Sequence, residues 1–181
     1  MMKFLCSRTV IATAAGTLLA ALLLNGVAQA VTDTIFKYSK PKTGYYSIST
    51  LDMIPSNSAD VYGQSGADQL IPGAGYCFNS GVHLPYRATI TALTAWSTSG
   101  VNGNPNFYLY RAKMLDSTSD IIAQMHPTDD SGTRKVAHIA IAASNLVDNM
   151  HYTYGLLVCL TSGSDIFNGA RLTYTYTNAG D

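Results

Sequence analysis

The chain has 181 residues with 11 basic and 11 acidic side chains, so its formal net charge at neutral pH is zero. A balanced charge of this kind does not indicate nucleic acid or an anionic membrane surface as a partner. Every acidic residue is an aspartate, and the chain contains 12 tyrosines. Aspartate is typical of turns and tyrosine of strands, so the composition favours a β-rich protein.

The first thirty residues have the pattern of a secretory signal peptide. Lys3 and Arg8 precede an apolar stretch over 10–28, and Ala28-Gln29-Ala30 matches the small-x-small pattern of a cleavage site. An uncleaved membrane anchor is the alternative, because the apolar stretch approaches the length of a membrane span. We expect residues 1–30 to be removed and 31–181 to form one secreted or periplasmic domain that has no membrane contact after cleavage.

After residue 31, short extended runs alternate with clusters of Gly, Pro, Asn, Asp and Ser. Regularly spaced turn signals between short runs are typical of sandwiches and barrels. We therefore predict an all-β fold, an antiparallel β-sandwich of jelly-roll-like type. The predicted strands are 34–38, 45–50, 76–79, 88–97, 106–113, 121–125, 135–142, 152–160 and 170–177.

The sequence patterns of three segments bear further on the predicted strands and loops. The run 152–160 is apolar on both alternating faces, which indicates a central strand covered on both sides. The alanines of 136–143 raise its helix propensity, but the run is short and is kept as a strand. The segment 55–75 has few apolar residues and many breakers, so we predict a long loop there.

Two cysteines, Cys77 and Cys159, follow the predicted signal peptide, whereas Cys6 lies within it. An even number of cysteines in an exported chain favours a disulfide between them. Two separate buried thiols are the alternative.

Six short blocks follow one another between Gly75 and Thr177. They are Val82-His83-Leu84-Pro85 with Ala88-Thr89-Ile90-Thr91-Ala92-Leu93, Leu109-Tyr110-Arg111, Ala123-Gln124-Met125, Tyr152-Thr153-Tyr154-Gly155-Leu156, and Gly169-Ala170-Arg171-Leu172-Thr173-Tyr174-Thr175. Their order resembles a poorly characterised β-sandwich-like domain of exported bacterial proteins, with the pattern LPxGAxITxL … YxYxL … GxRxxYT. This chain departs from the pattern at Tyr86-Arg87, where glycine is usual. The resemblance implies a fold and implies no activity.

The sequence contains no complete catalytic or metal-binding motif. The histidines after residue 30 form no HxxxH, HxH or HExxH pair, and no phosphate-binding or dinucleotide motif occurs. We therefore expect no catalytic residue and no cofactor. Asp129 and Asp130 offer oxygen ligands to calcium, but they do not match an EF-hand loop, so no metal is expected.

Aromatic residues at strand spacing are the candidate binding residues: Tyr108, Tyr110, Tyr174, Tyr176 and Trp96. If such a row faces solvent, it forms a flat platform on which a sugar ring can stack. Cross-strand packing that stabilises the sheet is the alternative role.

Two classes of function agree with these features. The first is a secreted, non-catalytic structural or interaction domain that self-associates through a strand edge or a tyrosine face. The second is a carbohydrate-binding module with a tyrosine platform and a glycan as its partner. An extracellular hydrolase is a third reading, for which no complete pair of nucleophile and base can be identified.

Overall fold

A computed structural model describes residues 36–64, 69–73, 76–98, 104–127, 135–143 and 145–179 of the chain. The segment Lys37–Asp181 forms one unit by itself. The predicted signal peptide and its cleavage site lie outside the described residues. Among the residues that are described, no helix has the length and apolar character needed to cross a membrane.

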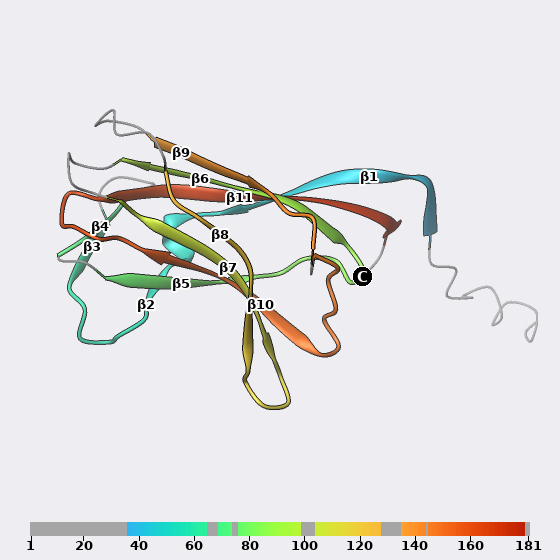
Figure 1. Ribbon diagram of the computed structural model, residues 1–181, viewed down its shortest axis with the longest axis horizontal. Helices are drawn as coiled ribbons and strands as arrows, with labels where there is room; N and C mark the ends of the chain where they lie inside the picture. The colour runs from blue at the N-terminus through green and yellow to red at the C-terminus, as the bar shows by residue number, and fades with distance from the viewer. Residues whose placement is uncertain are drawn as a thin grey trace, which may run out of the picture. The chain divides into compact units, whose positions relative to one another are not determined.

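Two antiparallel sheets pack face to face (Figure 1), which confirms the predicted β-sandwich. Sheet A has the order β3 (Tyr62–Gln64), β4 (Leu70–Pro72), β11 (Ile166–Ala179), β6 (Thr89–Thr98) and β9 (Lys135–Ala140), and β1 (Phe36–Ile48) also pairs with β11. Sheet B has the order β2 (Ile54–Pro55), β5 (Cys77–Val82), β10 (Tyr152–Cys159), β7 (Asn106–Lys113) and β8 (Ser119–Met125). A single 3-10 turn, η1 (Thr50–Asp52), follows β1.

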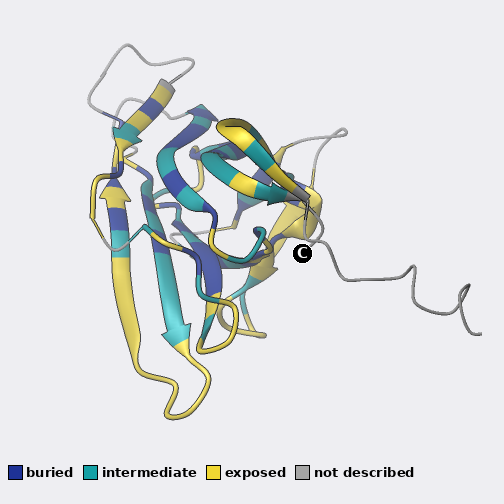
Figure 2. Ribbon diagram, turned by 90° about the vertical axis from the view of Figure 1, so that its right-hand side faces the viewer, coloured by how far each residue is buried: buried dark blue, intermediate teal, exposed yellow. Residues whose placement is uncertain are grey.

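The core lies between the sheets, because alternate residues of each strand point inward. Leu156 of sheet B and Leu172 of sheet A are fully buried, and the rings of Phe107 and Phe167 meet across the core with centroids 5.9 Å apart. Figure 2 shows these buried strand faces, and it shows that the hairpin between β7 and β8 is mostly exposed.

Strand β10 occupies the centre of sheet B, as its sequence predicts, and it pairs with β5 and β7 along its length. Cys159 lies directly opposite Cys77 of β5, and the two form the predicted disulfide with a Cα–Cα distance of 4.0 Å. The bond therefore joins two strands that are already hydrogen-bonded neighbours.

The loop from β10 to β11 is organised around the carboxylate of Asp165, which is fully buried. Its Oδ2 accepts hydrogen bonds from the backbone N–H of Thr161 (2.7 Å), the Thr161 hydroxyl (3.0 Å) and the N–H of Ser162 (3.1 Å). A buried carboxylate needs such donors, since an unsolvated charge is costly.

The structure corrects two predictions. The segment predicted as a long loop, 55–75, contains β3 and β4, because Leu70 is buried and pairs with Phe167 of β11. Residues 36–38 and 45–48 of the two predicted strands 34–38 and 45–50 belong to one strand, β1, which continues through Pro41 because it pairs with β11, whereas Thr50 lies in η1. The ambiguous run that begins near Val136 is a strand, β9, as predicted.

In the described part of the chain, β1 has β11 as its only strand partner, so its other side is a sheet edge. Lys37, Lys40, Pro41 and Lys42 are all exposed along it. Lysine and proline on an edge strand oppose pairing with another chain. This strand is therefore not suited to self-association by edge-to-edge pairing.

Candidate functional site

The five predicted aromatic residues occupy three different surfaces of the sandwich. Phe107 and Leu109 point into the core, so the alternate residues Tyr108 and Tyr110 lie on the outer face of sheet B, where both are half-buried. The ring of Tyr110 covers Gly155 on the neighbouring strand, where an added Cβ would collide with the tyrosine hydroxyl.

Tyr174 and Tyr176 pack against the edge of the core instead. Their ring centroids are 5.8 Å apart with planes inclined by 41°, and Tyr38 meets Tyr176 edge-on at 84°. Gly44 of β1 leaves room for the Tyr174 ring, since a Cβ there would overlap it. These rings are inclined to one another, so they do not form one flat platform.

Trp96 lies on the outer face of sheet A, where it forms part of a row that crosses three adjacent strands. The guanidinium carbon of Arg171, on the central strand β11, lies 5.5 Å from the Trp96 ring centroid on β6. The same carbon lies 5.2 Å from the ring centroid of Tyr45 on β1. Tyr45 is 63% exposed, and Trp96 and Arg171 are half-buried. A cation flanked by two aromatic faces is thus presented on this surface.

A β-bulge in β11 creates a hollow beside this row. The pairing of β11 with β6 shifts between Phe167 and Gly169, which leaves Asn168 as an extra residue. Gly169 has φ of +136°, a conformation that other residues rarely adopt, and an added Cβ would lie 3.3 Å from the carbonyl oxygen of Ile48. The bulge and the end of β1 then border an open surface hollow of about 380 Å³.

This hollow, the Arg171 pocket, is lined by Ser47, Ile48, Ser49, Trp96, Asn168, Gly169, Ala170 and Arg171. Its polar side chains are those of Ser47, Ser49, Asn168 and Arg171. Asn168 uses its side-chain oxygen to accept from the Thr98 hydroxyl (3.2 Å), and Ser49 uses its hydroxyl oxygen to accept from the Leu51 N–H (3.2 Å). The buried Nε of Arg171 has no acceptor among the described residues.

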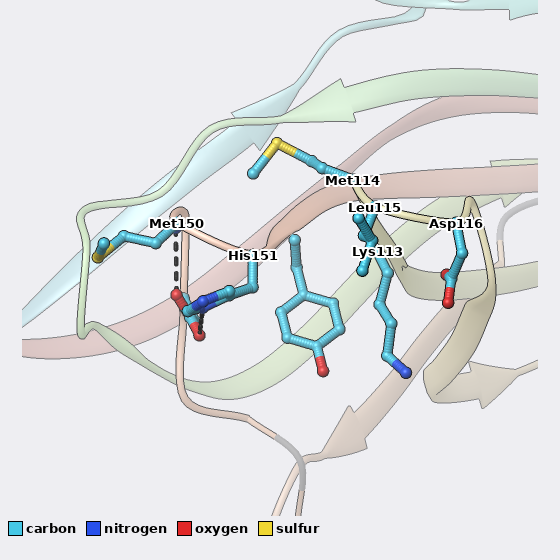
Figure 3. Close-up of a pocket in the computed structure, with 8 residues that line it drawn as sticks. Lys113, Met114, Leu115, Asp116, Met150 and His151 are labelled. Atoms are coloured by element: carbon cyan, nitrogen blue, oxygen red, sulfur yellow. Dashed lines mark hydrogen bonds and ion pairs between the residues drawn. The ribbon is translucent and has the colours of Figure 1, made fainter.

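A larger pocket of about 610 Å³ lies at the β7–β8 hairpin (Figure 3). Lys113, Met114 and Leu115 come from the hairpin, and Met150 and His151 come from the loop before β10. Leu115 is 95% exposed, Met150 68% and Met114 54%. This wall is therefore an exposed apolar surface with a charged margin.

Two titratable side chains of the hairpin pocket are hydrogen-bonded to each other. His151 Nδ1 is 2.8 Å from Asp148 Oδ2, and this hydrogen bond lowers the pKa of Asp148 from its ordinary value. Nucleophilic catalysis also needs a hydroxyl or thiol within reach of the histidine. The residues that line this pocket include no serine, threonine or cysteine, and the side-chain hydroxyl among them is that of Tyr152.

The calcium candidates Asp129 and Asp130 lie outside the described residues. Within the described ranges, no group of three or more His, Cys or Asp side chains is placed to hold a metal ion.

The sequence pattern selected Trp96 but gave no binding role to Asn168 and Arg171. The signal for Arg171 was present in Gly169-Ala170-Arg171, since a glycine inside a strand pattern indicates a bulge. No sequence signal places Tyr45 next to Arg171, because their strands are far apart in the chain.

The sequence matches no family model, and no curated protein matches it. Among solved structures, the chain is similar to the C-terminal CBM6 of LamC, a marine laminarinase from Zobellia galactanivorans (TM-score 0.48, 16% identity, 72% of this chain and 99% of that chain). It is also similar to the CBM22-1–GH10 modules of xylanase 10B from Clostridium thermocellum (TM-score 0.43, 12% identity, 74% and 28%). A further similar structure is the VP2 subviral particle of infectious bursal disease virus (TM-score 0.39, 13% identity, 77% and 34%).

Proposed function

We propose that this protein is a non-catalytic glycan-binding module whose binding site is the Arg171 pocket together with Trp96 and Tyr45. The observation that carries the proposal is the row of two aromatic rings around one guanidinium, next to a pocket with free polar donors. Binding pockets for small molecules combine aromatic walls with a few convergent polar groups in this way.

The aromatic rings and the polar side chains of the site would contact different parts of a sugar. A sugar ring presents C–H bonds on its faces and hydroxyls around its rim. The aromatic faces of Trp96 and Tyr45 supply apolar contact area at a low cost in side-chain entropy. Asn168 and Ser47 would meet the hydroxyls, and these polar contacts fix orientation. The site lies on paired strands, which hold side chains more precisely than loops do.

The proposed place of action is outside the cytosol. The Cys77–Cys159 disulfide is a bond that persists in oxidising compartments. It agrees with the signal peptide predicted for residues 1–30, whose removal would leave 31–181 as the mature domain.

A glycan array with the purified chain tests the proposal, with three variants applied to any glycan that binds. We expect Trp96→Ala and Tyr45→Ala each to weaken binding by about tenfold or more, since central aromatic contacts are worth at least about 1.4 kcal/mol. Tyr110→Ala is the matched control, because this tyrosine lies on the outer face of the other sheet. Binding that survives both Trp96→Ala and Tyr45→Ala, or the absence of any binding, would refute the proposal.

A second candidate function is an interaction domain that associates through the hairpin pocket. The exposed apolar side chains of Met114, Leu115 and Met150 favour it, because contiguous exposed apolar surface marks interaction sites. Sedimentation velocity of the wild type and of Leu115→Asp decides this candidate, with Ile54→Asp as a control on another exposed apolar side chain. A monomer at all concentrations would exclude self-association.

A further inference from the structure

The Arg171 pocket has an unusual balance of hydrogen-bonding groups, and we infer from it that the favoured glycans are acidic. The inference rests on the proposed function. In our assignment, an anionic group on the sugar, either a carboxylate or a sulfate ester, binds Arg171 while the ring stacks on Trp96. Both groups present coplanar or clustered oxygens that suit the planar donor fork of arginine.

Arg171 and the Asn168 amide N–H₂ give the pocket groups that only donate. The side-chain oxygen of Asn168 and the hydroxyl oxygen of Ser49 each already accept one hydrogen bond from within the protein. The hydroxyls of Ser47 and Ser49 can both donate and accept. A neutral sugar hydroxyl both donates and accepts, whereas an acidic group only accepts. The groups that only donate therefore match an acidic group better.

No carboxylate belongs to the residues that line the pocket. The nearby Asp52 is engaged with the protein, since its Oδ2 accepts from the backbone N–H of Ser49 at 3.2 Å. The residues that line the pocket therefore carry one formal positive charge, from Arg171, and the negative charge of Asp52 lies beside the lining residue Ser49. An anion in contact with Arg171 is attracted by the guanidinium, most strongly at low ionic strength.

A comparison with Arg111 shows what is different about Arg171. Both guanidinium groups lie over aromatic rings, that of Arg111 at 4.5 Å from the Tyr152 centroid. Arg111 also pairs with Asp120, with 3.2 Å between Nη2 and Oδ2. Within the described residues, Arg171 has no such partner, and its buried Nε lacks an acceptor. Because the Nε is buried, a ligand would reach Arg171 through its terminal Nη groups, to which an anionic group offers acceptors.

The experiment uses the fluorescence of Trp96, which is the single tryptophan of the chain and lies in the proposed site. The wild-type chain is titrated with a neutral galactose oligosaccharide, the matching oligogalacturonate and a sulfated galactose oligosaccharide, each at low and high salt. We expect one or both acidic ligands to bind about 10- to 100-fold more tightly than the neutral one, as a charged hydrogen-bond pair implies. We also expect this difference to shrink at high salt. The two acidic arms show whether carboxylate or sulfate is preferred.

Variants then assign the effect to one side chain. Arg171→Met should remove the preference for the acidic ligand, and Arg171→Lys should keep part of it, because lysine keeps the charge but loses the fork. Arg111→Met is the matched control and should keep the preference. If Arg171→Met does not fold, the comparison of acidic with neutral ligands in the wild type still tests the preference for acidic glycans.

Three results would count against the inference. Equal affinity for neutral and acidic ligands, with loss of both on Trp96→Ala, overturns the acidic preference and leaves the glycan-binding proposal standing. A preference that persists in folded Arg171→Met overturns the role of Arg171. The absence of any change in fluorescence and of any heat of binding with all three ligands overturns the inference, and the glycan array then decides the proposed function separately.

Discussion

Removal of the Cys77–Cys159 disulfide provides a quantitative test of the fold. The bond joins residues separated by 82 positions, so its removal releases a long closed loop in the unfolded chain. In the chain-entropy model this corresponds to about 4.5 kcal/mol of stability. For a unit of about 145 residues, an unfolding entropy of about 2 cal/mol/K per residue converts this loss into a fall in Tm of roughly 15 °C.

The assay is urea denaturation and a thermal scan of the wild type and of the double variant Cys77→Ala, Cys159→Ala. We expect the folded spectra of the two proteins to agree, because the β5–β10 pairing does not depend on the bond. A stability loss below about 1 kcal/mol would contradict the entropic reasoning. A change in the folded spectrum would contradict the claim that the bond only fastens strands already paired.

Three further outcomes are expected. Gly169→Ala should lower the free energy of unfolding by about 1–3 kcal/mol, because the residue has a positive φ. Gly63→Ala should be nearly neutral, because an added Cβ there meets no atom within 4 Å. Equal effects of the two variants in urea unfolding would refute the bulge geometry. Asp165→Ala should lower the free energy of unfolding by about 2–4 kcal/mol, since the donors of the loop lose a charged acceptor. A loss under about 0.5 kcal/mol would show that water replaces the carboxylate. His151→Ala should raise the pKa of Asp148 toward its ordinary value, as followed by NMR titration of the carboxyl carbon. Because the lowered pKa of Asp148 favours the folded state, Asp148 contributes to stability at neutral pH, and this contribution is lost in acid as pH falls through that pKa. An unchanged titration curve of Asp148 in the variant would disprove its coupling to His151.

Local patterns in the sequence predict most of the strands. The alternation in 152–160 predicts the central strand β10, and the placement of Cys77 and Cys159 in extended runs favours the observed bond. Pro41 and its flanking lysines resemble a loop, and only the pairing with β11 shows that β1 passes through them. Pairing between distant segments is a tertiary effect that single-strand patterns do not contain.

The candidate site was predictable only in part for the same reason. Alternation places Tyr108 and Tyr110 on one face, but it does not say that Trp96 lies on the other sheet. The flanking of Arg171 by Tyr45 and Trp96 depends on the register of three strands and on the bulge at Asn168. A bulge changes which side chains face outward, so its position must be known before a platform can be recognised.

The position of β11 also determines when during synthesis the proposed site can form. Strand β11 lies between β6 on one side and β1 and β4 on the other, although all three leave the ribosome before it. Until Ile166–Ala179 has emerged, these earlier strands lack the partner that pairs with them, and unpaired strand edges promote aggregation. A nascent chain truncated before Ile166 would therefore lack both the middle of sheet A and Arg171, so the proposed site cannot form before β11 is made.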